Sequence, residues 1–202
     1  MSSTSIFQRP AVPSRGGGSV SAIYIAFVPW VLFTLVIRRG SFLAAAVVAL
    51  AAAVLICLRS LSKGHPRLLE LAAVLAFAGF TTVAVVADPS ISAGVARYAR
   101  AVAAAGLALT AFGSLLFVPF TEQYARESVP RRFWVSPTFR LINRHLTAMW
   151  GWVFVAMIPS HLIAGAMNTH RANMIFNWVI PIVLIVWAAK RTAAVTSTVK
   201  GA

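Results

Sequence analysis

The side chains of this sequence best suited to chemistry are four histidines: His65, His145, His161 and His170. Paired histidines at two depths of a helical bundle are how a membrane cytochrome holds two haems by axial ligation. Only His161 lies well inside an apolar segment, because the other three stand in loops or at segment ends. Haem binding is therefore one hypothesis. The other is a neutral imidazole that hydrogen-bonds to a neighbouring helix.

Acidic and nucleophilic residues give little support to catalysis. The chain has four acids, at segment ends or in loops: Glu70, Asp88, Glu122 and Glu127. No two of them share an apolar segment, so the sequence does not contain the paired intramembrane carboxylates that a proton relay would need. Neither G-x-S-x-G nor H-E-x-x-H occurs. We therefore predict a protein that is not an enzyme and that holds no cofactor, with haem as the alternative.

Six apolar segments must position these residues, at about 20–37, 42–58, 68–87, 101–118, 146–167 and 174–189. The chain is 59% hydrophobic and 11% charged, with a mean hydropathy of +0.82. Runs of about 17–25 apolar residues are typical of membrane-spanning helices. The prediction is an all-α polytopic membrane protein with about six transmembrane helices. Five is the alternative, because the second and sixth segments are short.

The same pattern divides the chain into parts. Residues 1–18 are expected to be a disordered cytoplasmic tail, with a transit peptide as the alternative. Residues 19–191 form a single helical membrane domain with a basic amphipathic loop at 119–145. Residues 192–202 are expected to be a second cytoplasmic tail.

Basic residues are distributed unevenly about this pattern, and the net charge is +14. Six crossings place both termini on one side, and that side collects thirteen of the eighteen Lys and Arg residues. The side richer in Lys and Arg is cytoplasmic in short-looped membrane proteins. We therefore predict that both termini are cytoplasmic. No nucleic-acid-binding motif accompanies the charge, so nucleic acid is not an expected partner.

The loop at 119–145 is the one long polar stretch, and it holds the densest positive charge. Glu122 precedes Arg126 by four positions, and Glu127 precedes Arg131 by four. This spacing favours a helix, so we predict a short surface helix over 121–129. Interfacial aromatics and arginines favour headgroup anchoring. The candidate residues for binding lipid or a partner are Glu122, Arg126, Arg131, Arg132, Trp134, Arg140, Asn143 and Arg144.

A second group lies at or inside the spans and is expected to join helices by hydrogen bonds or, alternatively, to hold a ligand: Glu70, Trp150, His161 and Asn177. Buried polar side chains between membrane helices contribute about 0.6–2 kcal/mol each. Glu70 also suits a helix N-terminus, where its negative charge is favourable.

The order of short motifs resembles the intracellular septation protein A family of bacterial inner-membrane proteins, over roughly 28–189. The resemblance rests on Val28-Pro29-Trp30, Leu68-Leu69-Glu70-Leu71, Gly113-Ser114-Leu115-Leu116-Phe117, Pro119-Phe120-Thr121-Glu122, Trp134, Arg140, Asn143 and Asn177. It implies an integral protein of the cell envelope, tied to septation and acting through other membrane proteins. It supplies no catalytic residue.

The leading hypothesis is thus a non-enzymatic envelope protein that binds inner-membrane proteins and anionic lipid. A haem-binding redox protein and a small transporter or channel are the alternatives. The partner and the oligomeric state do not follow from the sequence.

Overall fold

The computed structural model describes residues 18–39, 41–62, 64, 66–127 and 129–200, with side chains from 25 to 197. The long helices are α1 (Gly18–Ile37), α2 (Phe42–Leu61), α3 (Leu68–Val86), α4 (Pro89–Ser114), α6 (Pro137–Met167) and α8 (Ile180–Lys200). The short elements are α5 (Phe120–Ala125), the 3₁₀ turn η1 (Arg131–Phe133), α7 (His170–Met174) and the π-helical turn η2 (Ile175–Val179). The described residues contain no strand. His65 and nearly all of the expected tail at 1–18 lie outside the described residues.

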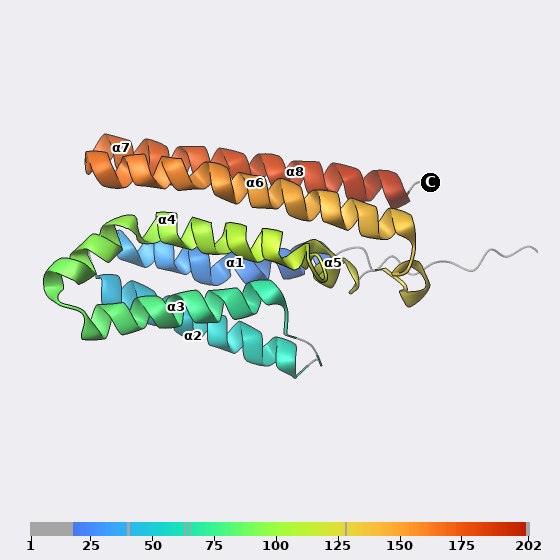
Figure 1. The fold of residues 1–202 in the computed structure, drawn as a ribbon, viewed down its shortest axis with the longest axis horizontal. Coiled ribbons are helices and arrows are strands. Elements are labelled where there is room, and N and C mark those ends of the chain that lie inside the picture. Colours follow the sequence, from blue (N-terminus) through green and yellow to red (C-terminus); the bar gives the residue numbers. More distant parts are fainter. Residues whose placement is uncertain (1–17, 40, 63, 65, 128, 201–202) are drawn as a thin grey trace, which may run out of the picture.

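The long helices run up and down, side by side, in three layers (Figure 1). The pair α6 and α8 covers α4 and α1, which in turn cover α2 and α3. The start of α1, the end of α8 and the short α5 lie at one end, which we call the tail end. The connections 38–41, 87–88 and 168–169 lie at the other, which we call the far end. This arrangement agrees with the expected placement of both termini on one side.

Among the described residues, five helices are long and apolar enough to cross a membrane: Phe42–Leu61, Leu68–Val86, Pro89–Ser114, Pro137–Met167 and His170–Ser197. In α1 the described apolar part, Ile25–Ile37, is shorter. Many large apolar side chains point outward, such as Leu75 at 74% and Leu109 at 75% exposure. Water would penalise that surface, whereas lipid does not. The chain is therefore an all-α, multi-pass integral membrane protein.

The helices extend beyond the apolar segments predicted from hydropathy. The second segment is a helix of 20 residues, and the sixth belongs to a helix of 28 residues, so neither is too short to span. Helix α8 runs on to Lys200, so the stretch 192–200, expected as a tail, is helical. No Gly or Pro interrupts that stretch, and its alanines favour helix.

The helices pack through two kinds of residue, small alanines and large aromatic rings. Ala45, Ala46, Ala49 and Ala53 of α2 are almost completely buried, which lets backbones approach closely in lipid. Aromatic rings fill the far half of the same layers, with Phe33 5.3 Å from Phe80 between ring centroids. These contacts give the two ends of the bundle fixed positions.

Candidate functional site

The basic loop begins with a turn that brings α5 back into the tail end of the bundle. The Ser114 hydroxyl donates to the Ala111 carbonyl at 2.7 Å and accepts from the Phe120 N–H at 3.0 Å. The Thr121 hydroxyl donates to the carbonyl of Asn143 at 2.8 Å, and it lies 2.8 Å from the hydroxyl of Thr147. Helix α5 is therefore fastened to both α4 and α6.

The predicted surface helix at 121–129 is wrong in extent and in exposure. Helix α5 ends at Ala125, and four of its six side chains are buried: Phe120, Thr121, Glu122 and Tyr124. The physical reason is the spacing of Phe120 and Tyr124, which places both rings on one helical face that packs into the core. Two of the aromatics expected to anchor the loop in headgroups, Phe120 and Tyr124, thus pack into the core instead, whereas Phe133 is exposed.

Only one of the two predicted Glu–Arg pairs along the loop forms. Glu122 is 3% exposed and lies 2.6 Å from the guanidinium of Arg126. Glu127 pairs with Arg67 at the start of α3 and not with Arg131. Because α5 ends at Ala125, Glu127 and Arg131 do not lie on a common helix, and the spacing of four residues does not bring them together.

Arg67 is the centre of a polar cluster that joins the turn before α3 to α5. It lies 2.9 Å from Glu70 and 4.6 Å from the centroid of the Tyr124 ring. Beside it, the Leu68 N–H donates to the Gln123 side chain at 2.9 Å. Burial, followed by the nearby charge of Glu70, raises the pKa of the Tyr124 hydroxyl, and Arg67 opposes that rise. The phenol therefore stays neutral at physiological pH.

Glu70 takes part in three contacts at once. It accepts from the backbone N–H of Arg67 at 3.4 Å, from the Arg67 guanidinium, and from the Ser60 hydroxyl at 2.9 Å. Glu70 is 2% exposed, so these three contacts replace the water that would otherwise solvate its carboxylate. This is the helix-start position expected from the sequence.

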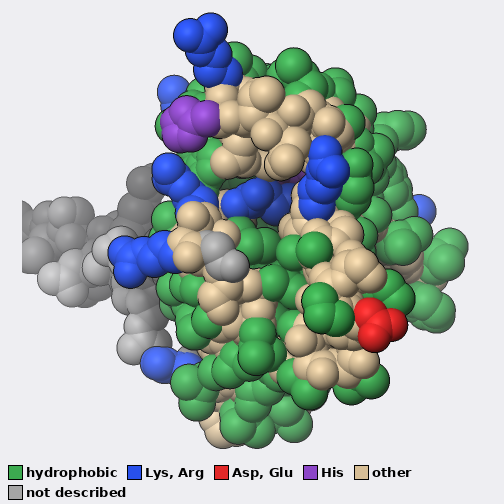
Figure 2. Space-filling model, turned by 90° about the vertical axis from the view of Figure 1, so that its left-hand side faces the viewer, with side chains coloured by type: hydrophobic (Ala, Val, Ile, Leu, Met, Phe, Trp, Pro, Cys, Tyr) green, Lys and Arg blue, Asp and Glu red, His purple; other side chains and the backbone are tan. Residues whose placement is uncertain are grey.

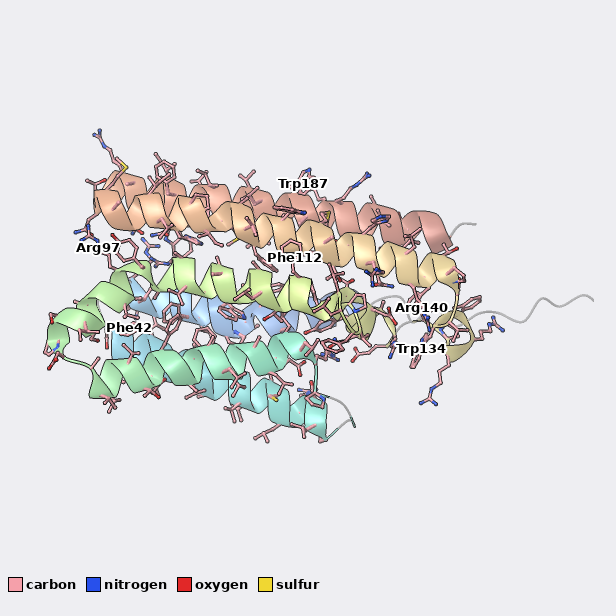
Figure 3. All side chains as sticks on the ribbon, viewed as in Figure 1. Phe42, Arg97, Phe112, Trp134, Arg140 and Trp187 are labelled. Carbon is pink, nitrogen blue, oxygen red and sulfur yellow. The ribbon has the colours of Figure 1, made fainter. Side chains whose placement is uncertain are left out.

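The remaining loop arginines face outward, and none of the three ion pairs in the described part of the chain uses them. The exposed members are Arg131, Arg132, Arg140 and Arg144. Arg126 and Arg131 lie 5.0 and 5.6 Å from the centroid of the Trp134 ring, which holds them at the rim of a groove of about 430 Å³. Figure 3 places Trp134 and Arg140 at the same end of the bundle.

The other predicted residues lie where α6 contacts α8, η2 or α5. Trp150 donates to the Thr192 hydroxyl at 3.1 Å, which joins α6 to α8. His161 Nδ1 lies 2.6 Å from Asn177 Oδ1, which joins α6 to η2. Asn143 is buried beneath α5 and donates to the Phe139 carbonyl, so it cannot reach a headgroup with the loop arginines.

Three of the four histidines lie in the described part of the chain. His145 and His161 are on the same helix, and their separation corresponds to roughly 24 Å of helical rise, so they cannot share one haem. His145 and His170 are exposed, at opposite ends of α6 and its continuation. Among the described residues, no group of three or more His, Cys, Asp or Glu side chains could hold a metal ion.

Sequence reasoning missed Arg67, Gln123 and Tyr124 as members of the tail-end cluster. Their contacts cross between α3 and α5, and spacing along one helix cannot reveal such contacts. Comparisons with family models, with curated proteins and with solved structures found no match to this chain.

Proposed function

We propose that this integral membrane protein acts without catalysis, by binding anionic lipid headgroups through the basic loop at the cytoplasmic surface of a bacterial inner membrane. The observation that carries the proposal is the division of charge in the loop. Both of its acids are already paired, Glu122 with Arg126 and Glu127 with Arg67. The exposed arginines therefore keep their full charge for an external anion.

The size of the electrostatic attraction favours an anionic lipid surface as the partner of the exposed arginines. Each Lys or Arg near an anionic leaflet contributes about 1 kcal/mol, so the four exposed arginines together supply about 4 kcal/mol. Helix α5 and the hydroxyl of Thr121 fix the start of the loop against α6, which lowers the backbone entropy lost on binding. Ordering each arginine side chain still costs about 0.5–1.5 kcal/mol. The attraction is screened by salt.

The resemblance to the intracellular septation protein A family adds a setting to this proposal. In that setting the protein belongs to the cell envelope, contributes to septation, and contacts other inner-membrane proteins. The same arginine face would serve an acidic segment of such a partner, because its charge is not specific for phosphate.

The test removes three exposed charges together, Arg131→Gln, Arg132→Gln and Arg140→Gln, and leaves Arg126 in its ion pair. The purified protein in a neutral detergent is supplied with phosphatidylglycerol, and the retained lipid is counted by native mass spectrometry. We expect the affinity for phosphatidylglycerol to fall by roughly tenfold or more, and salt to weaken binding to the parent protein.

A matched control removes three other basic residues, Arg59→Gln, Lys190→Gln and Arg191→Gln, all exposed and outside the loop. This variant loses the same net charge and should retain phosphatidylglycerol like the parent. Equal retention by both triple variants, at low and at high salt, would show that the loop is an anchor and not a binding face.

A further inference from the structure

A polar cavity of about 370 Å³ lies at the far end of the bundle, away from the basic loop. Its polar lining comes from α4, from the turn after α6, and from the start of the last helix: Arg97, Arg100, Asn168, Thr169, His170, Asn173 and Asn177. Figure 3 places Arg97 between α4 and α6 at this end. Figure 2, which faces the same end, shows Lys and Arg side chains gathered across its middle.

The side chains that line the cavity include two arginines and no aspartate or glutamate. None of the three ion pairs in the described part of the chain includes Arg97 or Arg100. The acid nearest along the chain is Asp88, the N-cap of α4. Helical rise separates it from Arg97 by roughly 14 Å and from Arg100 by roughly 18 Å. The positive charge of this cavity is therefore not balanced from within the protein.

The two guanidinium groups also have unused N–H groups. Arg97 donates to the carbonyls of Gly165 at 2.5 Å and Ala166 at 3.1 Å, which uses two of its five N–H groups. Arg100 makes one long contact, 3.4 Å to the carbonyl of Thr34, and its buried Nε–H has no acceptor among the described residues. An unsatisfied buried donor on a cation is costly, so an acceptor from outside the chain would stabilise it.

The opposite wall of the cavity is held open by an irregular turn. At η2 the last helix adopts π-helical geometry, which is frequent at functional sites. There Asn177 donates to the Asn173 side chain at 2.7 Å and accepts a 2.6 Å contact from His161. These bonds fix amide groups on the wall facing the arginines, so the polar lining is preorganised.

We propose that this cavity binds a small oxyanion carrying a phosphate group, with Arg100 as its principal ligand and Arg97 beside it. Guanidinium groups bind phosphate oxygens through paired, charge-assisted hydrogen bonds. A phosphate can carry two negative charges, which match the two arginines. Arg100 also lies well inside a membrane-spanning helix, where an ionisable residue without a partner points to a ligand.

Two sources supply this chemistry, free phosphate compounds and phospholipid headgroups. The test therefore measures thermal unfolding of the purified protein in neutral detergent with two probes. One is inorganic phosphate against chloride at equal ionic strength, and the other is short-chain phosphatidylglycerol against short-chain phosphatidylcholine. We expect one anionic probe to raise the unfolding midpoint in a saturable way.

Two substitutions then locate the binding. Arg100→Gln removes the principal ligand and should weaken the apparent affinity about tenfold or more. Asn173→Asp is nearly isosteric and keeps an oxygen to accept from Asn177, but it places a carboxylate in the cavity. It should abolish the same effect and keeps the test decisive if Arg100→Gln does not fold. Arg171→Gln removes an exposed charge at the same end, outside the lining, and should bind like the parent.

Each result has one meaning. Protection by inorganic phosphate that Asn173→Asp abolishes identifies a free oxyanion as the ligand. Protection by phosphatidylglycerol alone, lost in the same variant, identifies a lipid headgroup. No saturable protection by either probe, or protection that Asn173→Asp leaves unchanged, overturns the proposal. Under the function proposed above, phosphatidylglycerol also binds the basic loop. The phosphatidylglycerol arm is therefore run in the Arg131→Gln, Arg132→Gln, Arg140→Gln background, so that failure of one proposal is distinguishable from failure of the other.

Discussion

Arg67 and Glu127 form an ion pair across the groove at the tail end, although 60 positions of sequence separate them. The pair joins the connection before α3 to the turn after α5. It also holds Arg67 over the ring of Tyr124 and against Glu70. One arginine thus fastens the loop to the helical layers.

The first prediction concerns the unequal importance of the two carboxylates that contact Arg67. Arg67→Gln leaves Glu70, 2% exposed, with the Ser60 hydroxyl and a long backbone contact. We expect a loss of about 2 kcal/mol or more in the free energy of unfolding, because a buried carboxylate loses its counter-charge. Glu127→Gln removes the exposed partner and should cost less than about 1 kcal/mol. Denaturation in detergent micelles measures both, and equal losses would contradict the prediction.

The fold could be predicted from hydropathy because apolar segments long enough to span are distinctive. Their helical extent could not, since hydropathy reports contact with lipid and not the length of a helix. Helix α6 therefore begins at Pro137, well before the apolar segment that starts near 146. Likewise, α8 continues to Lys200 through residues that are not hydrophobic enough to signal a span.

The candidate site could be predicted only where its partners share one helix. The Glu122–Arg126 pair follows from its spacing. Glu127 has the same spacing to Arg131, yet it pairs with Arg67, because α5 ends at Ala125 and the four-residue preference applies only within a helix. From the sequence, Arg97 and Arg100 could only be assigned to the side of the membrane that has fewer Lys and Arg residues. Their common cavity depends on the turn after α6 and on η2.

The second prediction concerns the close approach of α4 and α6. A Cβ added at Gly151 would lie 2.8 Å from the ring of Phe112, whereas one added at Gly106 meets nothing within 4 Å. Gly151→Ala should therefore lower stability by about 1–3 kcal/mol through overpacking. Gly106→Ala should be neutral or slightly stabilising, because alanine favours helix. Unfolding midpoints of the two variants measure the difference, and equal midpoints would show that Phe112 moves aside without cost.

The third prediction concerns His161, which contacts Asn177 between α6 and η2. His161→Leu and Asn177→Leu should each destabilise the protein, and the double variant should lose less than the sum, with a coupling of about 1 kcal/mol. His145→Leu, on an exposed part of the same helix, should have little effect.

The same variants test the haem alternative. If His161 ligates haem, the purified parent protein shows a visible absorbance band, and His161→Leu removes it. We expect His161→Leu to leave the visible spectrum unchanged, because the function proposed above involves no haem. The contact of Nδ1 with Asn177 leaves Nε2 free to ligate iron, so the spectrum decides between the two hypotheses. A band that disappears in His161→Leu and persists in His145→Leu would establish the redox interpretation instead.

The last prediction concerns orientation. The tail end carries the exposed arginines of the basic loop, and such an excess favours the cytoplasmic side. In a Cys57→Ser background, single cysteines are placed by Gly94→Cys near the far end and by Thr138→Cys and Ser197→Cys toward the tail end. All three positions are exposed. A membrane-impermeant maleimide added to intact cells should label only Gly94→Cys, and all three should react after the membrane is permeabilised.

A fourth cysteine, Ser3→Cys, lies outside the described residues and tests whether α1 crosses the membrane. It should be protected in intact cells if α1 is a sixth span, because the start of α1 is then cytoplasmic like the end of α8. Labelling of Ser3→Cys together with protection of Ser197→Cys would leave five spans, with the N-terminus outside. Labelling of Thr138→Cys from outside would reverse the whole orientation. The basic loop could then not bind the anionic lipids of the cytoplasmic leaflet, and the proposed function would fail with it.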